Sequence, residues 1–228
     1  MTEIILAVLA AILAITLHEA AHGYAALAMG DDTAKLQGRT SLNPLVHVDR
    51  VGTILLPGAL AAMQLLTLGH VSFMFGWAKP VPVAAWRFRD PRRGMMIVAA
   101  AGPAMNFALA WLAGLALHLT PYMTETGGDL VEQFAGYFIL ANLVLGLFNL
   151  LPIPPLDGGR ILVGILPERA AMAWAGIERY GIVVVLLLVF LLPMAAREFG
   201  VAFNPVGTAL DVGLPWAMRL VLQLSGHG

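Results

Sequence analysis

The sequence predicts an all-α polytopic membrane protein with about five to six transmembrane helices, and three observations carry this prediction. Of the 228 residues, 59% are hydrophobic and only 12% are charged. The mean hydropathy is +0.81, well above that of a water-soluble domain with one buried core. Apolar stretches of about 20 residues, the length that spans a bilayer, recur along the chain. Six such spans leave too little chain for a separate soluble domain, so we expect residues 1–228 to form a single integral-membrane domain.

The apolar stretches define the expected elements. The first helix, residues 4–29, has no Lys or Arg before it and is longer than a signal peptide, so we expect it to be retained. The later elements follow in chain order: an apolar segment at 51–75, a third stretch at 94–119, a fourth at 131–151 that ends in a broken helix at LPIPPLDGG, a short helix at 160–165, a span at 177–192 and a weaker, interfacial stretch at 206–224.

Segment 51–75 is predicted to re-enter the membrane rather than to span it. A full span would place the two basic loops, 30–50 and 76–93, on opposite sides of the bilayer, against the positive-inside rule. If the segment folds back near Pro57-Gly58 or Gly69, both loops are cytoplasmic and the acidic loop 120–129 lies outside. Such backbone needs protein or a water-filled cavity to satisfy its polar groups, so we expect a wet interior.

Charge and cysteine content exclude several classes of protein. Lys and Arg total 13 and Asp and Glu total 14, giving a net charge of -1, so no basic surface indicates nucleic-acid binding. Cysteine is absent, which excludes disulfides, thiol nucleophiles and cysteine metal ligands. Any metal ion must therefore be held by His, Asp or Glu side chains.

The first expected helix contains the run His18-Glu19-Ala20-Ala21-His22 within an otherwise apolar span. Ionisable groups in a spanning helix are costly unless they pair, bind an ion or face water. Residues four apart lie about 40° apart around the helix axis, so both imidazoles can bind one metal ion beside Glu19. Two His ligands and a carboxylate base are components of a metalloprotease site. The alternatives are a hydrogen-bonded histidine pair inside the bundle and a chance match.

Two histidines leave a catalytic zinc site one protein ligand short. The candidate third ligand is Asp157, which lies in the sequence NLLPIPPLDGGR at residues 149–160. The prolines forbid a regular helix and the glycines permit a turn, so the helix breaks at membrane depth and presents a carboxylate there. The alternatives are that Asp157 caps the following helix or pairs with Arg160.

These two motifs together resemble the site-2 protease family of intramembrane zinc metalloproteases. Residues 101–106 (AGPAMN) and 76–83 (GWAKPVPV) are also similar to segments of the compact branch of that family, which lacks an added PDZ or CBS domain. The resemblance extends from His18 to Arg160 and therefore covers most of the chain.

The resemblance implies a role for each residue of the two motifs. His18, His22 and Asp157 are expected to bind one zinc ion per chain, and Glu19 is expected to act as the general base. Asn149, eight residues before Asp157, matches the family asparagine that assists substrate binding or stabilises developing charge.

Two further asparagines lie in the expected spans. Gly102, Asn106, Ala110 and Gly114 recur every four residues and form a stripe on which another helix can pack closely. Asn106 is predicted either to hydrogen-bond across that contact or to touch substrate or a ligand of the zinc site. Asn142 is expected to join helices by a hydrogen bond.

The sequence therefore predicts an intramembrane zinc endopeptidase of the cytoplasmic membrane, with its active site towards the cytoplasm. Its partners are expected to be the lipid bilayer and single-span membrane proteins, which it cleaves within their transmembrane segments. The resemblance implies that this cleavage serves regulated proteolysis or the removal of signal-peptide remnants. The non-helical segments 79–82 or 152–156 are expected to align the unwound substrate by edge pairing. The rival hypotheses are a divalent-metal transporter and an inactive protein that binds transmembrane helices.

Overall fold

The computed structural model describes residues 1–70 and 76–228, and these residues are helical without any strand. Five of the helical segments within them are long and apolar enough to cross a membrane, which confirms the predicted fold class. These segments are Thr2–Ala28, Arg50–Thr67, Pro91–Tyr122, Glu125–Asn149 and Glu168–Glu198.

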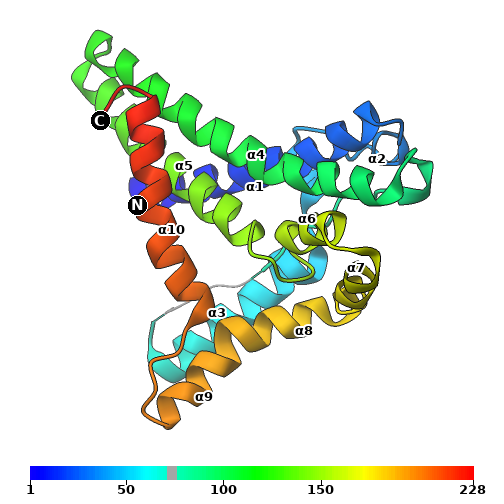
Figure 1. The fold of residues 1–228 in the computed structure, drawn as a ribbon. Helices are drawn as coiled ribbons and strands as arrows, with labels where there is room; N and C mark the ends of the chain where they lie inside the picture. The colour runs from blue at the N-terminus through cyan, green and yellow to red at the C-terminus, as the bar shows by residue number, and fades with distance from the viewer. Residues whose placement is uncertain (71–75) are drawn as a thin grey trace.

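Three long helices form the core of the molecule (Figure 1): α1 (Thr2–Ala28), α4 (Pro91–Ala116) and α5 (Glu125–Asn149). Each packs against the other two, and α10 (Pro205–Leu224) packs on α4 and α5. Small residues of α4 permit this close packing because they leave room for neighbouring helices. All four members of the predicted stripe are buried: Gly102, Asn106, Ala110 and Gly114.

The segment after the first polar loop is helical up to Leu68, and its two described ends lie close together. Arg50–Leu55 (η2) and α3 (Leu56–Leu68) form a continuous helical segment that passes through Pro57-Gly58 and stops at Gly69, whose φ is 75°. The backbone N–H of Trp77 donates to the carbonyl of Gly52 at 3.1 Å, so both ends of the segment lie together. This arrangement agrees with a re-entrant segment whose helix ends at Gly69 rather than at Pro57-Gly58. The remainder of the predicted turn falls on 71–75, outside the described residues.

The predicted break after the fourth span is confirmed. Helix α5 ends at Asn149, residues 150–156 form turns, and the chain resumes as α6 (Asp157–Ile165). The segments that follow are α7 (Glu168–Ala175), η5 (Glu178–Tyr180), α8 (Gly181–Leu186), η6 (Leu187–Leu191) and α9 (Leu192–Glu198). The other short helices are α2 (Thr33–Leu36), η1 (Pro44–His47), η3 (Ala85–Arg87) and η4 (Leu117–Tyr122).

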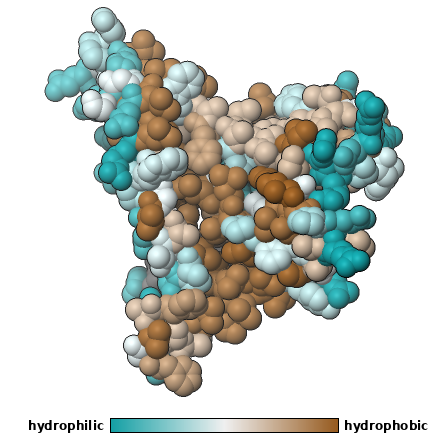
Figure 2. Space-filling view, viewed as in Figure 1, coloured by the Kyte–Doolittle hydropathy of each residue, from teal (hydrophilic) through white to brown (hydrophobic). Residues whose placement is uncertain are grey.

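The surface is divided in the way that a membrane protein requires. Figure 2 shows hydrophilic side chains gathered at two ends of this face, one around α2 and α7 and the other where α4 meets α5 through η4. Hydrophobic side chains occupy the region between them. The apolar belt is the part that contacts hydrocarbon in a bilayer.

Candidate metal centre

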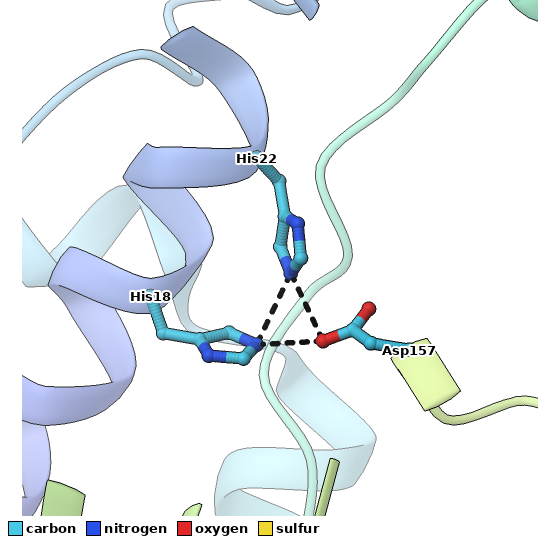
Figure 3. Close-up of side chains that lie close together, drawn as sticks. All are labelled: His18, His22 and Asp157. Carbon is cyan, nitrogen blue, oxygen red and sulfur yellow. Dashed lines mark hydrogen bonds and ion pairs between the residues drawn. The ribbon is translucent and has the colours of Figure 1, made fainter. Parts of the chain in front are cut away.

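Three side chains from two distant parts of the sequence converge in the structure (Figure 3). His18 and His22 lie one turn apart on α1, and Asp157 begins α6. The two Nε2 atoms are 3.1 Å apart, and they lie 3.2 Å and 3.3 Å from Oδ2 of Asp157. All three residues are buried, with exposed fractions of 4%, 8% and 7%. The group could hold a metal ion with one atom from each residue.

The hydrogen bonds on the far side of each imidazole fix which nitrogen faces the cluster. Nδ1 of His18 lies 2.6 Å from Oδ1 of Asn106, and Nδ1 of His22 lies 2.7 Å from the carbonyl of Val98. Both partners are acceptors, so each Nδ1 carries the proton and each Nε2 presents a lone pair. Among the described residues, no group donates a hydrogen bond to the buried Oδ2 atom of Asp157.

Three acceptor atoms without a proton between them repel one another unless a cation lies among them. Zinc bonds to histidine nitrogen and carboxylate oxygen at about 2.0–2.1 Å, so the edges of a tetrahedral site measure about 3.3 Å. The three observed separations are 3.1, 3.2 and 3.3 Å. The donor set and its spacing therefore fit a tetrahedral zinc ion with a fourth position left for water or substrate.

Helix α4 packs directly against the two imidazoles at Gly102. A Cβ atom at this position would lie 2.5 Å from Nε2 of His22 and 2.6 Å from Cε1 of His18. Real Cβ atoms do not approach other atoms so closely. Glycine is therefore required here because α4 approaches the imidazoles without space for a side chain.

The turn before α6 directs Asp157 at the histidines. The N-cap of α6 is Leu156, and Asp157 makes no capping hydrogen bond. Arg160 pairs instead with Glu178, with Nη2 at 2.6 Å from Oε1. Both alternatives considered for Asp157 are therefore wrong. Gly158 is buried so tightly that a Cβ would lie 2.2 Å from the carbonyl of Leu150, which explains the glycine after the aspartate.

The far end of α6 is held by Arg92 in the first turn of α4. Its Nη2 atom donates to the carbonyls of Val163, Gly164 and Leu166, the first at 3.0 Å. These carbonyls lack helical partners because α6 ends there, and a cation at a helix C-terminus is also favourable. No motif in the sequence marks Arg92. The only indication of its role is that a basic residue follows Asp90-Pro91, where a helix begins.

Glu19 and Asn149 occupy different positions relative to the cluster. Glu19 follows His18 on α1 and is partly exposed. Burial lowers the pKa of the nearby Arg39, and the negative charge of Glu19 partly offsets that shift. Asn149 donates from Nδ2 to the carbonyl of Leu145 in its own helix at 3.0 Å. This bond stays within α5, so it does not connect Asn149 to His18, His22 or Asp157.

A non-helical segment, residues 76–84, runs beside the cluster and is called the strap here. Lys79 N–H donates to the carbonyl of His47 at 2.8 Å, and the buried guanidinium of Arg39 donates to the Lys79 carbonyl. The side chain of Val81 lies within 3.5 Å of the Cβ position of Gly23, next to His22. Arg39 therefore orients backbone near the site, a role that its place in a basic loop of the sequence did not indicate.

Asp31 ties the end of the strap to the end of α1. Its Oδ2 atom accepts from the N–H of Ala84 at 2.6 Å, and its Oδ1 atom accepts from Thr33. Burial alone would raise the pKa of Asp31, but these hydrogen bonds outweigh burial and hold that pKa below its usual value. The carboxylate is therefore charged at neutral pH.

A membrane helix with an HExxH run, joined by a distant carboxylate, defines the metalloprotease class. The family model for Peptidase family M50 matches residues 122–192. YwhC of Bacillus subtilis, which carries the name of a zinc metalloprotease, is 40% identical over 196 residues, covering 83% of this chain and 81% of YwhC.

Two mycobacterial relatives carry similar names. Rip3 of Mycobacterium tuberculosis is 37% identical over 58% of this chain and 31% of its own length. Rip2 of Mycolicibacterium smegmatis is 30% identical over 78% of this chain and 63% of its own length. No solved structure gives a significant match. The chain therefore belongs to peptidase family M50, the site-2 protease family, and is a protease.

Proposed function

We propose that this protein is an intramembrane zinc endopeptidase that cleaves the transmembrane segment of single-span membrane proteins. The observation that carries the proposal is the convergence of three acceptor atoms, from His18, His22 and Asp157, at the edge lengths of a tetrahedral zinc site. Two of them belong to a helix that is long and apolar enough to cross a membrane, so the reaction takes place within the bilayer.

The residues of the site have different proposed roles in the reaction. His18, His22 and Asp157 hold zinc, which when bound polarises the scissile carbonyl and lowers the pKa of water towards neutrality. Glu19, beside His18, accepts the proton of the attacking water and returns it to the leaving amine. Asn149 remains a proposed contact for substrate: its Nδ2 atom is bonded to the carbonyl of Leu145, and its amide oxygen can accept a hydrogen bond from a substrate N–H group.

The strap is proposed to align the unwound substrate. A helical substrate hides its carbonyls, so cleavage requires local unwinding, and an extended peptide can pair with an exposed backbone edge. Segment 152–156, the other candidate, is folded into turns, as the bond from Leu156 N–H to the Ile153 carbonyl shows. The strap has no helix or turn, and the backbone N–H groups of Trp77 and Lys79 donate to the carbonyls of Gly52 and His47, on the same neighbouring segment. Alternate residues, such as Ala78, then face the opposite edge.

We propose that the metal site lies nearer the cytoplasmic side of a cytoplasmic membrane. The HExxH run belongs to the last part of α1, and the loop that follows α1 carries Lys35, Arg39 and Arg50. The opposite end of the bundle carries Glu125, Asp129 and Glu132. This distribution supports an orientation with the basic loops inside.

The test is cleavage by purified protein in detergent against a panel of single-span reporter proteins. Wild type, Glu19→Gln and wild type with a chelator are compared, and bound zinc is measured in each. We expect Glu19→Gln to retain zinc and to cut at least about 100-fold more slowly, the size of a general-base effect. Removal of zinc should abolish cleavage. Cleavage that survives both treatments would overturn the proposal. Metal flux across a vesicle membrane that is equal for wild type and Glu19→Gln would instead favour a transporter.

A further inference from the structure

A buried chain of hydrogen bonds links the site to a helix that contributes no ligand. Asn142 of α5 donates from Nδ2 to the carbonyl of Phe138 at 2.8 Å. Its Oδ1 atom accepts from Nδ2 of Asn106 at 2.8 Å, and Oδ1 of Asn106 lies 2.6 Å from Nδ1 of His18. Both asparagines are fully buried, with exposed fractions of 0%. The chain joins α5, α4 and α1 in that order.

The direction of every bond in this chain follows from its first member. The carbonyl of Phe138 can only accept, so the NH₂ group of Asn142 must face it and its oxygen must face Asn106. Asn106 then directs its own NH₂ group to Asn142 and its oxygen to His18. That oxygen can only accept, so the His18 proton must lie on Nδ1. Turning either amide over would bring two donors or two acceptors together within a buried contact.

We infer that Asn142 is a positioning residue that sets the tautomer of His18 through Asn106. The proton on Nδ1 leaves the lone pair of Nε2 directed at Asp157 and His22, which is the form that binds a metal ion. His22 does not need such a chain, because the carbonyl of Val98 accepts from its Nδ1 directly. The inference rests on the proposed function only in taking Nε2 of His18 as a metal ligand.

A directional chain differs from simple interhelical packing in what it tolerates. Asn142→Asp keeps an oxygen facing Asn106 in either protonation state, so the direction of the chain survives. Asn142→Leu removes that oxygen and leaves only the carbonyl of Ala14, at 3.5 Å, as an acceptor for Nδ2 of Asn106. The Asn106 amide can then turn its NH₂ group towards His18, which moves the proton to Nε2. A packing role predicts that both substitutions leave the tautomer unchanged.

The experiment measures the tautomer of His18 in metal-free protein and the affinity for zinc separately. Long-range ¹H–¹⁵N NMR of histidine-labelled protein in micelles reports the tautomer, with His18→Gln used for assignment. Zinc affinity is measured by competition with a chelator. Thr16→Val is the matched control, because Thr16 is buried on α1 near His18 and its hydroxyl donates to the carbonyl of Ile12 within that helix. Circular dichroism confirms that each variant is folded.

We expect wild type, Thr16→Val and Asn142→Asp to carry the His18 proton on Nδ1. Asn142→Leu should move it at least partly to Nε2 and weaken zinc binding by about 10–100-fold, the usual effect of losing an outer-shell partner. In an Asn106→Leu background, Asn142→Leu should have no further effect on the tautomer.

An Nε2 proton in wild type, or an unchanged tautomer in folded Asn142→Leu, would overturn the inference. Because the tautomer is read without metal or substrate, a protein that cleaves no reporter can still support it. Its failure is thus distinct from failure of the proposed function.

Discussion

The close approach of α4 to the imidazoles makes Gly102→Ala a quantitative test of the metal centre. The added methyl would lie 2.5 Å from Nε2 of His22, about 0.9 Å inside the 3.4 Å at which ordinary contact begins. Overpacking of this kind costs about 1–3 kcal/mol. If the imidazoles move to relieve it, that cost weakens zinc binding by about 5–150-fold.

The assay is chelator competition for zinc, with thermal unfolding measured in parallel on metal-free protein. Gly136→Ala is the control, because Gly136 lies in α5 and nothing lies within 4 Å of its Cβ position. Alanine in a helix gains about 0.5–1 kcal/mol over glycine, so the control should be slightly stabilised with unchanged zinc affinity. Wild-type zinc affinity in Gly102→Ala would refute the packing argument.

Three further predictions concern the supports around the site. Arg92→Met should leave the final carbonyls of α6 without their donor, lower the free energy of unfolding by about 1–3 kcal/mol and speed amide exchange in α6. Arg92→Lys should keep part of the protection against exchange. Equal exchange rates in wild type and both variants would contradict this role of Arg92. Because the folded-state pKa of Asp31 is depressed, its contribution to stability is present above its unfolded pKa of about 3.9 and is lost as pH falls through the folded pKa. Melting temperatures should therefore fall less between pH 6 and pH 3 in Asp31→Asn than in wild type, and parallel curves would reject this role. Arg39→Met should release the strap at Lys79 and slow reporter cleavage while zinc stays bound; loss of zinc instead would place Arg39 in the metal site.

The clustered residues could be predicted from the sequence because the patterns that mark them are local. His18 and His22 are related by the helical period, and Asp157 is marked by the prolines and glycines that break a span. Gly69 ends the re-entrant helix as its conformational freedom allows, with φ at 75°. Pro57-Gly58 was a weaker indication of the place where the segment folds back, because proline in the first turn of α3 is compatible with a helix.

The supports of the site were not predicted because they depend on which helices pack together. The two alternatives for Asn106 were a bond between helices and a contact with a ligand of the site, and the structure shows both, since it contacts Asn142 and His18. The roles of Arg39 and Arg92 depend on backbone carbonyls 40 and 71 residues away. A side chain that binds carbonyl oxygens leaves no pattern in the partner sequence, because every residue has a carbonyl.

Helix α4 contributes no candidate ligand, yet it contacts both histidines and packs on α6, the helix that carries Asp157. Its Val98 carbonyl orients His22, Gly102 admits both imidazoles, and Asn106 orients His18. At its start, Arg92 holds the far end of the short helix that carries the third ligand. The proposed ligands come from two segments that are distant in sequence, and α4 packs against both of these segments. Substitutions on this face of α4 should therefore reduce metal affinity before they alter any step of catalysis.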